Sequence, residues 1–178
     1  MSDRLRLFVA VDLPRPVRTE LARWAAQAVP TDARRVPETN LHLTLAFLGS
    51  RLRADADAAA ALLPALAGPL GALTTAGALW LPPRRPAVLT VALAATPQLE
   101  ALHRSVVAAL AGAVGYEPEQ RRFRPHVTVA RMRHATRTAT EPPAPPLRTF
   151  RAEALTLYRS YTGPGGSRYE RLASEPLA

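Results

Sequence analysis

Two short stretches decide how this chain folds: NLHLTLAFLG at Asn40–Gly49 and RPHVTVAR at Arg124–Arg131. Each contains a histidine and a threonine two residues apart, set among alternating aliphatic residues. This alternation predicts a β-strand with one buried face, because successive side chains of a strand point to opposite sides of its sheet. Each strand is therefore expected to bury its aliphatic residues and to present an imidazole and a hydroxyl together on its other face.

Strict alternation also assigns the remaining residues of the two strands. It places Ala46 and Ala130 after the threonines on the polar face, where a small side chain leaves room for a ligand. It places Arg131 out of phase with His126, on the core side unless the strand ends or bulges nearby. The residues that it directs into the core are Leu41, Leu43, Leu45, Phe47, Val127 and Val129.

The repeated histidine–threonine pair suits acid–base chemistry on a phosphate group. Imidazole titrates near about 6.5, so one ring accepts a proton while another donates one around neutrality. Threonine hydroxyls donate hydrogen bonds to phosphate oxygens, and the guanidinium of Arg131 matches an oxygen pair if it faces the cleft. A single copy is typical of an ordinary surface histidine. Two copies in matching frames, 84 residues apart, indicate two related halves that face each other across a shared cleft.

Helix and strand patterns alternate along the rest of the chain without regular βαβ units, which favours an α+β fold. Apolar residues at helical spacing predict helices over Pro16–Ala28, Asp55–Leu66 and Pro97–Val114. A hairpin turn is expected at Gly163–Gly166, and a stiff surface connector at Glu141–Pro146. Further strands are expected at Arg4–Leu13, Leu73–Leu81, Ala87–Ala94, Arg151–Tyr161 and Arg168–Leu172.

Length and composition predict one soluble, cytoplasmic domain over residues 1–178, and a monomer. The absence of cysteine excludes a disulfide scaffold, a thiolate nucleophile and cysteine-ligated metals. No stretch reads as a secretory signal or a membrane span.

The net charge is +9, every one of the 23 cations is arginine, and the excess is shared by both halves of the chain. Such a charge attracts polyanions. The densest cluster is Arg121, Arg122, Arg124, Arg131, Arg133 and Arg137.

The other two histidines are interpreted as surface residues. His103 lies off the apolar face of its predicted helix, and His134 follows a strand in a polar stretch. No histidine has a histidine partner three or four residues away, as a helical zinc site requires. We therefore expect no metal and no cofactor.

These motifs resemble the paired signatures of the 2H phosphoesterases, and among them the bacterial and archaeal RNA 2′,3′-cyclic phosphodiesterases, long labelled 2′-5′ RNA ligases. RLFVAVDLP at Arg6–Pro14 and LTLYRSYTGPGGSRYERL at Leu155–Leu172 also fit this family. The resemblance implies an α+β fold of two pseudo-symmetric lobes, each an antiparallel or mixed sheet with outer helices, around a central cleft. It also implies metal-independent opening of 2′,3′-cyclic phosphates, on RNA 3′ ends or small cyclic nucleotides, to 2′-phosphomonoesters.

By the same resemblance, His42 is the proton donor and His126 the proton acceptor, although the residues themselves allow the opposite assignment. Thr44, Thr128 and Arg131 would bind the phosphate. Tyr161, beside the glycine-rich turn, is our prediction for the aromatic ring that stacks on a base. Two other functions stay open: 2′-5′ RNA ligation, which is the same chemistry in reverse, and a non-catalytic basic RNA-binding module.

Overall fold

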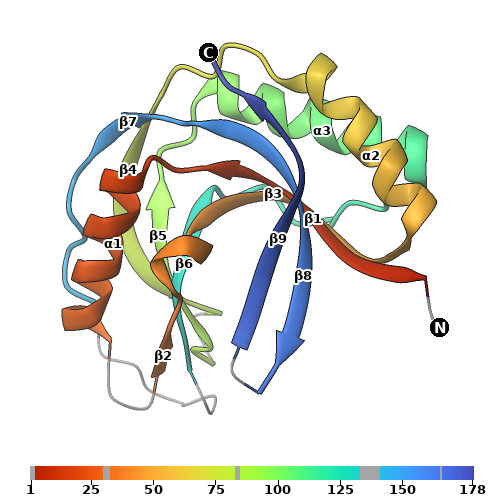
Figure 1. Cartoon of the computed structure of the whole chain (residues 1–178). Helices are drawn as coiled ribbons and strands as arrows, with labels where there is room; N and C mark the ends of the chain where they lie inside the picture. The colour runs from red at the N-terminus through yellow and green to blue at the C-terminus, as the bar shows by residue number, and fades with distance from the viewer. Residues whose placement is uncertain (1–2, 30–32, 83–84, 133–140, 165) are drawn as a thin grey trace.

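The computed structural model describes residues 3–29, 33–82, 85–132, 141–164 and 166–178. Within these ranges the chain forms an α+β fold of strands and helices (Figure 1). In chain order the elements are β1 (Arg4–Asp12), α1 (Arg15–Ala28), β2 (Ala33–Arg35), a 3₁₀ turn (Glu38–Asn40), β3 (His42–Leu52), α2 (Arg53–Leu66), β4 (Ala72–Leu81), β5 (Val88–Leu93), α3 (Pro97–Val114), β6 (His126–Met132), β7 (Thr149–Arg151), β8 (Ala154–Gly163) and β9 (Gly166–Pro176).

The strands form one antiparallel sheet whose centre is the contact between the two histidine strands. Their order is β7-β4-β5-β6-β3-β1-β8-β9, and β2 adds to β6. β3 and β6 pair at a single position, Leu43 with Val127, while each pairs at length with a neighbour on its outer side, β1 or β5. The two halves of the sheet therefore meet where the two histidine–threonine motifs lie and separate on either side of that point.

The helices cover the outer sides of these two halves (Figure 1). α1 packs beside β6 and buries Val17, Leu21 and Ala25, which share one helix face. α2 and α3 pack on each other and on the half that contains β1 and β3. The α3 range matches its predicted bounds, because Thr96 accepts a hydrogen bond from the Leu99 N–H at its start and Gly115 ends it with φ of 59°.

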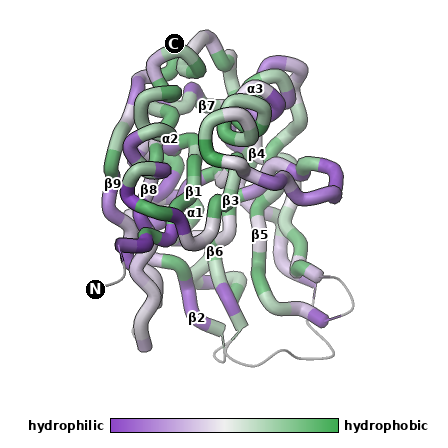
Figure 2. The backbone as a smooth tube through the Cα atoms, turned by 90° about the vertical axis from the view of Figure 1, so that its right-hand side faces the viewer, coloured by the Kyte–Doolittle hydropathy of each residue, from purple (hydrophilic) through white to green (hydrophobic). Residues whose placement is uncertain are grey.

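Figure 2 shows hydrophobic residues along β5 and hydrophilic residues in β2.

The short strands β2 and β7 were not predicted, because three residues carry too little periodic signal. β3 continues past the expected end at Leu48 to Leu52. None of the described helices is long and apolar enough to cross a membrane.

Each histidine strand contains a β-bulge one residue after its threonine. In the β1–β3 ladder Val9 pairs with Ala46 and Ala10 with Thr44, so Leu45 is the extra residue. In the β5–β6 ladder Leu89 pairs with Ala130 and Thr90 with Thr128, so Val129 is the extra residue. An extra residue reverses the phase of the side chains that follow it, in β3 until a second extra residue at Leu48.

The two bulges correct three predictions. Ala46 and Ala130 were expected on the polar face, but they are 2% and 0% exposed and lie in the core. Phe47 was expected in the core, but it is 43% exposed and faces the cleft. Arg131, at the equivalent position of β6, also turns toward the cleft, which is the outcome expected if the strand bulges before it.

Candidate active site

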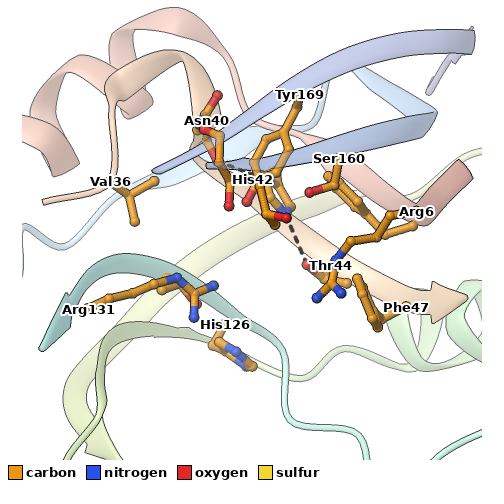
Figure 3. A pocket seen from close by; sticks show the side chains of 14 residues that line it. Arg6, Val36, Asn40, His42, Thr44, Phe47, His126, Arg131, Ser160 and Tyr169 are labelled. Atoms are coloured by element: carbon orange, nitrogen blue, oxygen red, sulfur yellow. Dashed lines mark hydrogen bonds between the residues drawn. The ribbon is translucent and has the colours of Figure 1, made fainter. Parts of the chain in front are cut away.

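All four residues of the two motifs line one pocket of about 340 Å³ between the halves of the sheet. The antiparallel contact of Leu43 with Val127 brings them together, because each of these two residues stands between the histidine and the threonine of its motif. Figure 3 shows His126 and Arg131 on one wall of the pocket, with His42 and Thr44 on the facing wall. Arg131 also lines this pocket. The structure therefore brings together five of the six predicted site residues.

The two histidines are held by the same kind of hydrogen bond. Nδ1 of His42 lies 2.8 Å from the carbonyl oxygen of Asn40, and Nδ1 of His126 lies 2.7 Å from that of Arg124. A carbonyl oxygen only accepts, so Nδ1 carries the proton and Nε2 holds the lone pair in each neutral ring. Thr44 lies 3.0 Å from Nε2 of His42 and donates its hydroxyl proton there. Nε2 is thus the basic nitrogen of each ring, and that of His42 is hydrogen-bonded to Thr44.

Aromatic rings enclose His42. Phe8 stacks on its imidazole with centroids 4.8 Å apart, and Tyr169 contacts it edge-on at 5.4 Å. Burial among these groups lowers the pKa of His42 to about 4. The Asn40 carbonyl and the Asp12 carboxylate act in the opposite direction, while the positive charge of Arg131, and that of His126 whenever it is protonated, lower the pKa further. In the free protein His42 is therefore neutral at neutral pH.

The two histidines differ in their neighbours on the adjoining strand. His42 pairs with Asp12 of β1, whereas His126 pairs with Ala92 of β5. Among the described residues, aromatic stacking partners are found for His42 but not for His126. The two histidines are therefore alike in the carbonyl bond to Nδ1 and in the neighbouring threonine. They differ in the nearby carboxylate and in the aromatic rings, which only His42 has among the described residues.

Asp12 is 2% exposed and is fixed by a buried network. Its carboxylate accepts hydrogen bonds from Thr156 at 2.9 Å and from the Tyr158 hydroxyl at 2.7 Å, and pairs with Arg171 at 2.8 Å. Burial and the bond to Asp12 raise the pKa of Tyr158 to about 12, so this hydroxyl stays protonated as a donor. The network holds a negative charge beside His42, which stabilises its protonated form.

Other residues that line the pocket escaped the sequence reasoning. Arg6 places its guanidinium carbon 4.6 Å from the centre of the Phe47 ring, and Figure 3 shows it reaching toward Thr44. In the sequence it is one of two arginines in the alternating first part of β1, and nothing there sets it apart from Arg4. Asn40 and Tyr169 lie near His42 and come from the 3₁₀ turn and from β9. Their positions depend on pairings far apart in sequence.

Tyr161, the predicted base-stacking residue, does not line this pocket. The guanidinium groups of Arg159 and Arg168 each lie 4.4 Å from its ring centre, and its hydroxyl donates to Glu170. Phe47 and Tyr169 are the aromatic rings that reach the cleft surface beside the histidines.

The remaining predictions concern residues away from the pocket. His103 of α3 stacks on Phe123 at 3.9 Å and is half-buried, not part of the pocket. His134, Arg133 and Arg137 lie outside the described residues. Across the described ranges, no three histidine, aspartate or glutamate side chains are grouped so as to hold a metal ion.

The pKa of His42 gives a prediction that separates it from the other histidines. In the free protein its ring should remain neutral until the pH falls to about 4. Bound inorganic phosphate places negative charge in the pocket, stabilises imidazolium, and should move the titration toward about 6.5 or above. Histidine NMR signals recorded against pH, with and without phosphate, measure this. His103, which lies outside the pocket, should not respond to phosphate. If the His42 titration is also unchanged, phosphate does not bind beside this ring and the predicted phosphate site is wrong.

Comparisons with known proteins identify the family of this chain. A family model described as the 2′-5′ RNA ligase superfamily matches residues 13–164. The chain is 34% identical over 176 residues to the RNA 2′,3′-cyclic phosphodiesterase of Escherichia coli (strain K12), a match that covers 97% of this chain and 96% of that protein.

Crystal structures extend the comparison to the whole fold. Escherichia coli LigT in apo form has a TM-score of 0.79 at 29% identity and covers 99% of both chains. LigT complexed with 3′-AMP has a TM-score of 0.78 at 29% identity and covers 98% of this chain and 99% of its own. TT0787 of Thermus thermophilus has a TM-score of 0.77 at 29% identity, covering 97% of this chain and 98% of its own. These matches confirm the predicted resemblance, and the chain belongs to the 2′-5′ RNA ligase superfamily of 2H phosphoesterases, with the LigT-like α+β fold.

Proposed function

We propose that this protein hydrolyses 2′,3′-cyclic phosphodiesters, at RNA 3′ ends or on small nucleotides, to 2′-phosphomonoesters. One observation carries the proposal: two histidines from separate strands line one pocket, each tethered through Nδ1 so that Nε2 is the basic nitrogen. The similar protein of Escherichia coli is an RNA 2′,3′-cyclic phosphodiesterase, and LigT was crystallised with 3′-AMP. In this proposal the two halves of the sheet are the two lobes of one catalytic domain.

The proposed reaction uses the histidines as an acid and a base. His126 accepts a proton from water through Nε2 as the water oxygen attacks phosphorus. His42 donates a proton from Nε2 to O3′ as the P–O3′ bond breaks, which leaves the phosphate on O2′. Each transfer is worth roughly 10²–10⁴-fold in rate. The lower pKa of free His42 is compatible with this role, because the bound phosphate anion and Asp12 both favour its protonation.

The remaining side chains stabilise charge on the phosphate. Thr44 and Thr128 lie beside the histidines and donate hydroxyl protons to non-bridging oxygens, where negative charge grows in the transition state. For Thr44 this means exchanging its bond to His42 for one to phosphate. Arg131 and Arg6 supply full positive charges from opposite walls of the pocket.

The test is incubation with 2′,3′-cyclic AMP in the presence of EDTA, with chromatography against 2′-AMP and 3′-AMP. We expect complete conversion to 2′-AMP, at a rate that the chelator does not change. Formation of 3′-AMP would contradict the leaving-group assignment, and loss of activity in EDTA would contradict the metal-independent mechanism.

Two other functions give different results in matched experiments. Ligation requires that an oligonucleotide with a 5′-hydroxyl replace water, so adding one to a cyclic-phosphate RNA would yield a longer product. A non-catalytic RNA-binding module would leave the cyclic phosphate intact, and its binding would weaken with salt but survive replacement of either histidine. If hydrolysis is the main reaction both with and without the 5′-hydroxyl oligonucleotide, the result supports the proposed function over ligation and over simple RNA binding.

A further inference from the structure

A second hollow, of about 420 Å³, adjoins the histidine pocket between β2, β6 and the turn that joins β8 to β9. It is continuous with the histidine pocket, because six residues line both: Val36, Asn40, Arg131, Thr162, Ser167 and Tyr169. A molecule held at the histidines can therefore extend into this hollow without leaving the protein surface.

The hollow is basic. Arg34, Arg35 and Arg131 line it, and no aspartate or glutamate is among its described lining residues. Arg34 of β2 pairs directly with Arg131 of β6, so two like charges occupy neighbouring positions on one face of the sheet. Such a pair destabilises a sheet. Neither guanidinium forms an ion pair with an acidic residue in the described part of the chain. An anion bound between them would relieve this repulsion.

The turn between β8 and β9 positions Arg34. Its guanidinium donates to the carbonyl oxygen of Pro164 at 3.3 Å and lies against Gly166. A Cβ atom on Gly166 would overlap Nη2 of Arg34, and the backbone there has φ of 112°, which side chains disfavour. Glycine at this position thus leaves the space in which the Arg34 head group lies, at the rim of the hollow.

We propose that this hollow binds a second phosphate, the one on the 5′ side of the nucleoside whose 2′,3′-cyclic phosphate lies at the histidines. The inference rests on the proposed function and specifies its substrate class: nucleotides that carry a 5′ phosphate group, whether the diester of an RNA chain or a terminal monoester. Arg34 provides the recognition. Arg131 lies between the two phosphates and serves both. Val36 and Tyr169, which line both hollows, flank the intervening nucleoside.

Binding measurements test the subsite independently of catalysis. By calorimetry, adenosine 2′,5′-bisphosphate should bind the protein roughly 10- to 100-fold more tightly than 2′-AMP, as charge-assisted hydrogen bonds predict. Arg34→Gln should abolish most of this difference and leave the affinity for 2′-AMP unchanged. The variant should fold, because it removes one of two facing like charges. Arg104→Gln, a matched charge removal on exposed α3, should keep the full difference.

Kinetics then separate the two sources of the phosphate. Adenosine 2′,3′-cyclic phosphate, its 5′-phosphorylated form and the dinucleotide ApA ending in a 2′,3′-cyclic phosphate are compared as substrates. We expect KM to be lower by about tenfold or more for both longer substrates, and Arg34→Gln to remove that advantage without changing the rate on the simple cyclic nucleotide. If only the 5′-phosphorylated mononucleotide has a lower KM, the subsite binds a terminal 5′-monoester and not the diester of an RNA chain.

The two proposals fail in different ways. If none of the three substrates is cleaved, the proposed function is wrong. If all three are cleaved with equal KM, or Arg34→Gln weakens all of them and 2′-AMP equally, the proposed function stands and the second phosphate site is wrong.

Discussion

His42→Gln and His126→Gln are each expected to lower kcat for 2′,3′-cyclic AMP by about 10²–10⁴-fold while the protein stays folded. Glutamine fills a similar space and keeps a donor for the carbonyl of Asn40 or Arg124, but it has no group that exchanges a proton near neutral pH. The loss should appear in kcat more than in KM, because Thr44, Thr128 and Arg131 still bind the phosphate.

Two controls make this result specific. His103→Gln removes an imidazole that stacks on Phe123 outside the pocket, so the rate should stay within about twofold of the parent protein. The double variant His42→Gln/His126→Gln should lose less than the product of the two single losses, because residues that act as a unit are not additive. A single variant that keeps wild-type kcat, with a far-UV spectrum showing it folded, would contradict the two-histidine mechanism.

The strand face on which the histidines and threonines lie could be predicted from the sequence because these residues precede the bulges. Up to Thr44 and Thr128 the period of two holds, so the polar face can be read directly from the pattern. After them, Leu45 and Val129 each add a residue that only the partner strand reveals. A bulge is a mismatch in residue count between two paired strands, and the pairing joins segments that are far apart in the sequence. Phe47 and Ala46 were therefore assigned to the wrong faces.

The acidic partner of His42 shows the same limit at longer range. Asp12 appears in the sequence only as the end of a strand, yet its carboxylate is held by Thr156, Tyr158 and Arg171, from the opposite end of the chain. The charge asymmetry between His42 and His126 arises because Asp12 and Ala92 occupy equivalent positions of β1 and β5. No spacing within either motif carries that information.

This asymmetry makes the acid and base roles testable with a substrate whose leaving group needs no acid. In the 3′-thio analogue of 2′,3′-cyclic AMP, sulfur replaces O3′ and a thiolate leaves. Because thiols titrate near about 8.5, far below ribose hydroxyls, the thiolate departs without protonation. His42→Gln should therefore lose about 10²–10⁴-fold on the oxygen substrate but stay within about tenfold of the parent protein on the sulfur substrate. His126→Gln should lose activity on both, since water must still be deprotonated.

The reason to expect this order lies in what surrounds each ring. His42 pairs with the buried Asp12, so when the phosphate anion binds, the carboxylate and the phosphate together offset the burial that lowers the pKa of the free ring. Among the described residues, His126 has neither a carboxylate paired with it on the adjoining strand nor a stacked ring. If the sulfur substrate rescues His126→Gln instead, the roles are reversed, and if it rescues neither variant, His42 does not protonate the leaving group. Rescue of His42→Gln alone is the expected result, because Asp12 lies beside His42 whereas Ala92 holds the equivalent position beside His126.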